Sequence, residues 1–307
     1  MSVKRKEILA SAAAIVLLLA AGLMLGGYVQ YILALVAINA MVVLSLDVLV
    51  GRLGLISIGH AGFVAIGAYA SAVLAAHHWP FILALPVAGI LATACGLLLG
   101  IPALRLAGFY LAIGTLAFGS VVEQVIRSLR GITGGPFGLA VSPISFFGAT
   151  LSASAYFVCL IAALTAFASV AWHVRDSVLG RAMSAVKTSE PAAQSIGIDV
   201  VGTKLIGFAL SGLGAGIAGA LYGPLVGFLG PEHFTFLTSV SYLAMAVLGG
   251  TGVIGAILGA TTITVIPEFF ATLGDYSSLV WGVAMLLILA ISPRGLAYLG
   301  RRRRVLG

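Results

Sequence analysis

A few side chains capable of chemistry interrupt an otherwise apolar sequence. His60 follows Ser57 and Gly59 within the stretch GLISIGHAGF, and His77 and His78 stand together in HHWP. Nucleophilic catalysis needs a nucleophile beside a base, and phosphate binding needs a glycine-rich loop with a lysine. The sequence contains no G-x-x-x-x-G-K-[ST], H-E-x-x-H or G-x-S-x-G motif. We therefore expect no catalytic residue, no metal site and no cofactor or ATP bound by this chain itself.

The composition indicates where these residues lie. Of the 307 residues, 61% are hydrophobic and 8% are charged, whereas soluble proteins average about 25% charged residues. Such a chain would expose too much apolar surface in water, so we expect an all-α membrane protein that crosses the bilayer many times. The net charge of +7 comes largely from basic clusters at the ends of apolar segments, such as 4–6 and 301–304. These clusters are typical of topology signals and lipid contact, not of nucleic-acid binding.

Apolar runs long enough to cross about 30 Å of hydrocarbon recur along the chain. We predict ten spans, at 8–26, 29–49, 55–76, 81–104, 108–128, 151–173, 204–226, 235–250, 252–271 and 277–293. Glycine and proline interrupt the third span and the last three, so eight or nine spans are also compatible with the sequence. Lysine and arginine gather in alternate loops, which predicts that both termini, the loop 174–203 and the basic tail 294–307 are cytoplasmic. The chain 1–307 then forms one transmembrane domain, whose first helix is retained because it is longer than a signal-peptide core.

The stretch from Gly54 to Val73 is rich in small residues. Alanines follow one helical face at Ala61, Ala65, Ala68 and Ala72, which predicts close contact with another helix. One hypothesis is that the sequence Ser57-Ile58-Gly59-His60 before them forms a helix break lining a solute pathway, where free amide groups can meet a solute. Alternatively, His60 hydrogen-bonds a neighbouring helix and serves packing alone. Asn39 and Thr115 have the same two possible roles.

The longest polar segment, 174–203, is predicted to hold two short helices. Its core, GRAMSAVKTSEPAAQSIGI, begins with Gly180 and Arg181. Glu190 before a proline is typical of a helix start, because the helix dipole favours an acid there and proline needs no donor. Small side chains let another surface approach, and a glycine fits the left-handed position that ends a helix; these residues are Ala192, Ala193 and Gly197. An ordinary amphipathic loop helix is the simpler alternative.

This loop resembles the coupling segment of permease subunits of bacterial ABC importers, and three motifs narrow the resemblance to the branched-chain amino acid permease family. The first is LSLDVLVGRLGLISIGHAGFVAIGAY, residues 44–69, which resembles L-N-L-x-x-G-x-x-G-x-x-S-x-G-H-A-x-F-x-x-x-G-A-Y. The second is GFYLAIGTLAFG, residues 108–119, which resembles G-x-Y-x-A-I-x-T-L-A-F. The third is ITGGPFGL, residues 132–139, which resembles T-G-G-x-x-G-L and contains Gly134 and Gly135. The resemblance covers about residues 35–295, and the four motifs are specific only together.

The resemblance implies a type II-like importer bundle in the bacterial inner membrane that moves branched-chain or other hydrophobic amino acids into the cytoplasm. It implies a homologous sister permease, two ABC ATPase subunits that hold ATP and Mg²⁺, and a periplasmic solute-binding protein. The coupling residues would be Gly180, Arg181, Glu190, Ala192, Ala193 and Gly197. The candidates for the translocation pathway or helix break are Asn39, Ser57, Gly59, His60, Thr115, Gly134 and Gly135.

Two residues depart from the family pattern, because Asp47 replaces the usual asparagine and Phe137 replaces a polar residue. Both bear on the solute, and an importer subunit for urea, short amides or sugars stays open. A transporter of another class, coupled to protons or sodium, would use buried acids such as Asp47, Glu123 or Glu268. The coupling-segment pattern argues against that class, because a secondary transporter has no ATPase to contact.

Overall fold

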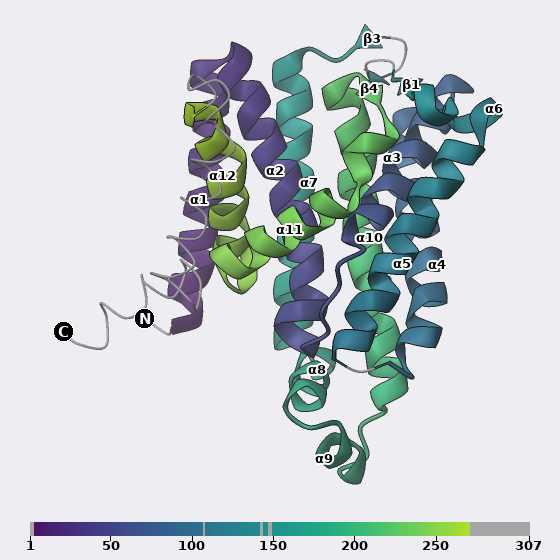
Figure 1. The fold of residues 1–307 in the computed structure, drawn as a ribbon. Coiled ribbons are helices and arrows are strands. Elements are labelled where there is room, and N and C mark those ends of the chain that lie inside the picture. The colour runs from purple at the N-terminus through teal and green to yellow at the C-terminus, as the bar shows by residue number, and fades with distance from the viewer. Residues whose placement is uncertain (1–2, 107, 142–143, 147–148, 271–307) are drawn as a thin grey trace.

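The computed structural model describes residues 3–106, 108–141, 144–146 and 149–270, and helices dominate it (Figure 1). The long helices are α1 (Val3–Leu25), α2 (Gly27–Asp47), α4 (Phe81–Ala103), α5 (Phe109–Ser128), α7 (Ala153–Asp176), α10 (Val200–Val226) and α12 (Gly252–Phe270). The shorter ones are α3 (His60–Ala76), α6 (Arg130–Thr133), α8 (Val178–Thr188), α9 (Glu190–Ser195) and α11 (Phe236–Gly249), with the turns η1 (Val48–Leu53), η2 (Gly135–Phe137) and η3 (Pro231–Phe234). The short strands are β1 (Leu139–Ala140), β2 (Ser145–Phe146), β3 (Ala149–Thr150) and β4 (Phe228–Leu229).

This architecture confirms the predicted all-α, multi-span fold. In the described part of the chain, 6 helices are long and apolar enough to cross a membrane: α1, α2 continued by η1, α4, α5, α7 and α10. Three further apolar segments have only 10–17 residues: α3, α11 and the part Gly252–Glu268 of α12. Each predicted span from the first to the ninth contains one of these helices. The tenth predicted span, 277–293, and the basic tail 294–307 lie outside the described residues.

The predicted third span, 55–76, is wrong at its N-terminal edge. The π-helical turn η1 continues α2, and Gly54 ends that turn in the left-handed conformation with φ 71°. The chain then runs without helix through 54–59, and α3 begins about halfway along the bundle (Figure 1). At about 1.5 Å per residue, α3 is roughly 26 Å long and α11 roughly 21 Å, so neither alone crosses about 30 Å of hydrocarbon.

Glycine and alanine make the closest helix contacts, between α10 and its neighbours α3 and α4. A Cβ atom on Gly67 of α3 would lie 2.0 Å from the carbonyl oxygen of Gly216 in α10. A Cβ atom on Gly219 would lie 2.0 Å from the Val64 carbonyl oxygen. The predicted alanine face of α3 is buried at Ala61, Ala65, Ala68 and Ala72. The prediction of close helix contact is therefore confirmed, and α10 is the helix it meets.

The two ends of the bundle are built differently. One end carries α8 and α9 and is also the end at which α1 begins (Figure 1). Near this end, Arg175 of α7 forms a 3.0 Å ion pair with Glu7 of α1. At the opposite end β1 pairs antiparallel with β4, which joins the turn after α5 to the turn after α10. The distribution of lysine and arginine predicts that the α8–α9 end faces the cytoplasm.

The substitution Gly67→Ala tests the contact between α3 and α10. The added methyl group would overlap the Gly216 backbone, which cannot turn aside as a flexible side chain can. Overpacking of this kind costs about 1–3 kcal/mol, so we expect the protein purified in detergent to unfold at a clearly lower temperature, followed by tryptophan fluorescence.

Gly131→Ala is the matched control, because nothing lies within 4 Å of the Cβ position there. An equal loss of stability in both variants would contradict the close contact.

Candidate functional site

The helix break before α3 is supported by α5. The Ile58 amide donates a hydrogen bond to the Thr115 hydroxyl at 2.9 Å, and that hydroxyl donates to the Ala112 carbonyl at 2.9 Å. Gly59 lies against the Thr115 backbone, where a Cβ atom would be 1.7 Å from the carbonyl oxygen. In an apolar environment, each backbone group released from a helix needs another partner. The predicted pathway residues Gly59 and Thr115 are thus in direct contact.

His60, the first residue of α3, is completely buried. Its Nε2 atom lies 2.8 Å from the hydroxyl oxygen of Ser45 on α2, and that hydroxyl donates to the Val42 carbonyl at 2.7 Å. A hydroxyl has one hydrogen, so Nε2 is the donor to Ser45 and Nδ1 is an acceptor. Among the described residues, His60 Nδ1 and the buried Ser57 hydroxyl have no hydrogen-bond partner. Two predicted pathway residues therefore present unpaired polar atoms at the break.

The start of α11 lies beside the start of α3. The Ala61 amide donates to the hydroxyl of Ser239 on α11 at 3.0 Å, and Ser211 of α10 donates to the Ser45 carbonyl at 2.8 Å. A small cavity adjoins the break and is lined by Ile58, Leu116, Gly119, Ser120, Phe234, Thr235, Phe236 and Ser239. The N-terminal ends of two short helices therefore converge inside the bundle.

The serines that form hydrogen bonds around the break could not be predicted from the sequence. Ser211 is a lone hydroxyl in an apolar run, Ser239 stands between Thr238 and Ser241, and Ser45 lies two residues before Asp47. Nothing in these local sequences points to His60 or to α3, and the fold alone brings the serines together.

A polar stripe follows one face of α5. Ser120, Gln124 and Ser128 recur every four residues and are all exposed, and Ser120 also lines the small cavity. Polar side chains are costly against lipid, so within a membrane they face protein or water. This face of α5 therefore suits contact with another subunit or with an aqueous pathway.

The remaining predicted pathway residues lie elsewhere. Asn39 of α2 donates from Nδ2 to the Thr264 hydroxyl of α12 at 2.9 Å, which is a contact between two helices. Gly134 and Gly135 have positive φ angles of 76° and 59° and form the tight turn between α6 and η2. That turn lies at the end opposite α8 and α9 (Figure 1). Asn39, because it contacts α12, and the two glycines, because they lie in this turn, do not join the break at His60.

The loop 174–203 contains the two short helices α8 and α9. As predicted, α9 begins at Glu190, and Gly197 follows it with a φ of 83°. Beneath both helices lies a hydrophobic cluster separate from the main core, which we call the cytoplasmic cluster. Its buried members come from η1, the break and five helices: Val48, Leu49, Leu53, Leu55, Ala103, Leu111, Met183, Val186, Ala193, Val200 and Phe208.

Some of the predicted coupling residues are internal. Ala193 is buried in the cytoplasmic cluster, and a Cβ atom on Gly180 would lie 2.3 Å from the Val174 carbonyl oxygen of α7. Glu190 forms a 2.6 Å ion pair with Lys204 of α10, which holds the start of α9 against that helix. Gly180 and Ala193 are therefore buried within the loop, whereas the Glu190 side chain beside Lys204 is 44% exposed.

Other residues of the loop form an exposed surface. Arg181, Ala192 and Gly197 are exposed, and so are two apolar side chains that the sequence motifs did not single out, Val178 at 74% and Ile196 at 73%. Ile196 lies beside Ala192 and Gly197 at the exposed end of α9, outside the membrane-spanning helices. We call Ala192, Ile196 and Gly197 the α9 tip.

The three acids considered for ion coupling all have partners in the fold. They are Asp47 with Arg52 and the Gly252 amide, Glu123 with Arg127, and Glu268 with the Tyr28 hydroxyl. Among the described residues, no group of three His, Cys, Asp or Glu side chains is placed to hold a metal ion.

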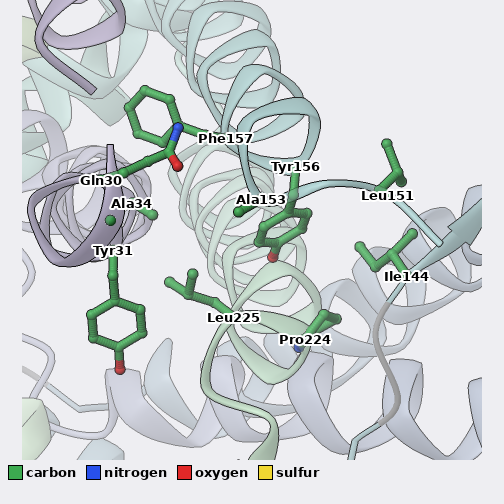
Figure 2. Close-up of a pocket in the computed structure, with 11 residues that line it drawn as sticks. Gln30, Tyr31, Ala34, Ile144, Leu151, Ala153, Tyr156, Phe157, Pro224 and Leu225 are labelled. Carbon is green, nitrogen blue, oxygen red and sulfur yellow. The ribbon is translucent and has the colours of Figure 1, made fainter. Parts of the chain in front are cut away.

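A larger cavity of about 300 Å³ opens near the end opposite α8 and α9, between α2, α7 and α10 (Figure 2). Its lining is mostly apolar, with polar groups from Gln30, Tyr31 and Tyr156. The Tyr156 hydroxyl donates to the Leu221 carbonyl of α10. This cavity shares no lining residue with the small cavity at the break.

The substitution Thr115→Val tests the support of the break by α5. Valine keeps the shape but leaves the buried Ile58 amide without an acceptor, which costs about 1–3 kcal/mol. We expect faster hydrogen exchange in peptides covering 54–62, measured by mass spectrometry.

Thr165→Val is the control, because that hydroxyl bonds only the Ile161 carbonyl of its own helix. If Thr115→Val leaves exchange at 54–62 unchanged, the break does not depend on this bond.

Known proteins resemble this chain over most of its length. Residues 28–289 match the family described as branched-chain amino acid transport system / permease component. The chain is 38% identical over 281 residues to the high-affinity branched-chain amino acid transport system permease protein LivM of Escherichia coli strain K12, covering 82% of this chain and 66% of the relative. LivM of Salmonella typhimurium strain LT2 has the same identity and coverage. The autoinducer 2 import system permease protein LsrC of Enterobacter sp. strain 638 is 28% identical over 72% of this chain and 67% of its own length.

The chain spans slightly less than two thirds of the length of the two LivM relatives, at 66%. No solved structure matches it. The family match extends from α2 beyond α12 and agrees with the helical, multi-span architecture. The chain therefore belongs to the branched-chain amino acid transport system permease family.

Proposed function

We propose that this chain is the permease subunit of an ATP-driven importer that carries branched-chain or other hydrophobic amino acids across the bacterial inner membrane into the cytoplasm. One observation carries the proposal. The short helices α3 and α11 begin side by side within the bundle, where Ser57 and His60 hold unpaired buried polar atoms. Discontinuous helices that begin inside the membrane are a general way to build a solute site. The LivM relatives are named for branched-chain amino acid transport, which supports this solute class.

The chemistry of the break suits an amino acid. Helix N-terminal ends carry partial positive charge and attract a carboxylate. The acceptor Nδ1 of His60 can receive a hydrogen bond from an ammonium group. Ile58, Leu116 and Phe236 supply apolar surface in the adjoining cavity for an aliphatic side chain. These groups together would recognise both ends of a hydrophobic amino acid.

The structure corresponds to a closed state of such a site. The cavity at the break has a volume of about 10 Å³, enough for about one water molecule and too small for an amino acid. Solute entry therefore requires α5 and the start of α11 to separate. The polar stripe of α5 (Ser120, Gln124 and Ser128) is exposed on the same side and would face the sister permease across the pathway.

The energy source would be external to this chain. Its sequence has no phosphate-binding loop, so ATP with Mg²⁺ would be bound and hydrolysed by two separate ATPase subunits. The α9 tip offers them an exposed apolar contact next to the cytoplasmic cluster. A solute-binding protein would deliver the amino acid at the opposite end. The alternative of a secondary transporter is less well supported, because Asp47, Glu123 and Glu268 are all engaged by other groups.

Uptake into vesicles tests the proposed function. The chain is co-expressed with the sister permease, ATPase and binding-protein genes from its own genomic neighbourhood, and the complex is reconstituted in proteoliposomes. We expect uptake of radiolabelled leucine, isoleucine or valine that requires both ATP and the binding protein. Uptake driven by a proton or sodium gradient without ATP, or ATP-driven uptake of only urea or a sugar, would overturn the proposal.

The substitution Ile196→Asp tests the α9 tip. A charge at this exposed apolar position disfavours its burial against another protein, so we expect much less ATPase subunit to copurify with the tagged permease. Phe137→Asp is the matched control, since Phe137 is 86% exposed but lies in η2, at the opposite end of the bundle. Equal copurification with both variants would show that the α9 tip is not the contact.

A further inference from the structure

The end of the α2–η1 helix is unusual in its hydrogen bonding. η1 is a π-helical turn, a rare conformation with poor hydrogen-bond geometry that recurs at functional sites. The amides of Gly54 and Leu55 both return to the Leu49 carbonyl. The carbonyls in the last turn of a helix have no partner within it. The Gly51 carbonyl is one of these and needs a donor from elsewhere.

That donor comes from α8. The Lys187 ammonium donates to the Gly51 carbonyl oxygen at 2.7 Å. The side chain also lies over Gly54, where a Cβ atom would be 3.0 Å from Lys187 Cγ. A cation at the C-terminal end of a helix is favoured by the helix dipole as well as by the hydrogen bond. Lys187 therefore caps the helix that leads into the break, although it belongs to a different part of the chain.

The rest of the contact between α8 and η1 is apolar. Met183 and Val186 of α8 join Leu49 and Leu53 of η1 in the cytoplasmic cluster. Hydrophobic contacts are not directional, so they hold two surfaces together without fixing one register between them. The hydrogen bond from Lys187 to a single carbonyl is directional and supplies that register.

Two further contacts hold the ends of η1, one toward the break and one toward α12. Leu55, the second residue after η1, is buried in the same cytoplasmic cluster. On the other side, Asp47 at the end of α2 accepts a hydrogen bond from the Gly252 amide at the start of α12, at 3.2 Å. A displacement of η1 therefore acts on the segment 54–59, which ends at His60.

We propose that Lys187 is a positioning residue that fixes η1, and through it the break at His60, to α8. Movement of α8 imposed by a partner is then passed to the solute site through the backbone of η1 and 54–59. This inference rests on the proposed function for its role in transport, but the contact itself is tested without transport.

Hydrogen exchange of the purified chain in detergent gives the first test. Lys187→Met keeps the aliphatic stem and removes the donor, so we expect exchange of the peptides covering 48–59 to be about tenfold faster, the factor expected for loss of a charged hydrogen bond. Lys187→Arg retains a donor and should restore slow exchange. Arg181→Met should leave 48–59 unchanged, because Arg181 is exposed like Lys187 but donates to the Asp176 carbonyl and not to η1. Unchanged exchange in Lys187→Met would overturn the inference.

Coupling in the reconstituted complex gives the second test. We expect Lys187→Met to assemble with its partners and hydrolyse ATP but to move several times less leucine per ATP, and Lys187→Arg to recover most of the ratio. A wild-type ratio in Lys187→Met, or a loss of assembly and ATP hydrolysis in parallel with uptake, would overturn the positioning role.

The two proposals fail in different ways. If the wild-type complex shows no ATP-driven uptake of amino acids, the proposed function is wrong, and the exchange experiment still decides whether Lys187 holds η1. If wild-type uptake is present and exchange in Lys187→Met is unchanged, only the role of Lys187 is wrong.

Discussion

The structure depends on one constraint, the need of every backbone polar group in an apolar layer for a hydrogen-bond partner. The non-helical segment 54–59 releases such groups inside the bundle. The Thr115 hydroxyl accepts a hydrogen bond from the Ile58 amide, and the Ser239 hydroxyl accepts one from the Ala61 amide. Gly59 and Gly119 let α5 come close enough for the bond to Thr115. The positions of α5 and α11 follow from this need. The same arrangement leaves the Ser57 hydroxyl and His60 Nδ1 unpaired, and on this observation the proposed solute site rests.

A second consequence concerns how the molecule divides. The main core joins α1, α2, α3, α7, α10, α11, α12 and one end of α5. The cytoplasmic cluster joins η1 and the break to α8, α9 and parts of α4, α5 and α10. The helices proposed to meet an ATPase therefore share a core with the segment that leads to the proposed solute site. A force applied to α9 enters this smaller cluster first. Coupling then needs no long chain of contacts through the main core.

Hydropathy predicted the helices well, because whether a segment enters lipid depends on the apolar character of the whole segment and not on single residues. It failed at the start of α3, because Leu55, Ile56 and Ile58 are as apolar as a helix would require although their backbone is not helical. Polarity within an apolar run identified Ser57 and His60. It could not identify the partners Ser45 and Ser239, and it grouped Asn39 with the break, because sequence spacing does not reveal which distant helix a side chain meets. Small residues predicted a close helix contact, because they allow any helix to approach. For the same reason they could not show that the helix in contact is α10.

The shortness of α3 has a consequence for biogenesis. A segment about 26 Å long, with a buried histidine at one end, is poorly suited to stable insertion as an isolated helix. Its close partner on α10, around Gly216, is synthesised much later, after α4, α5 and α7. During synthesis α3 can pack against α4, which follows it directly, but its closest backbone contacts form only when α10 arrives. The order of translation thus places the tightest contact of α3 among the last to form.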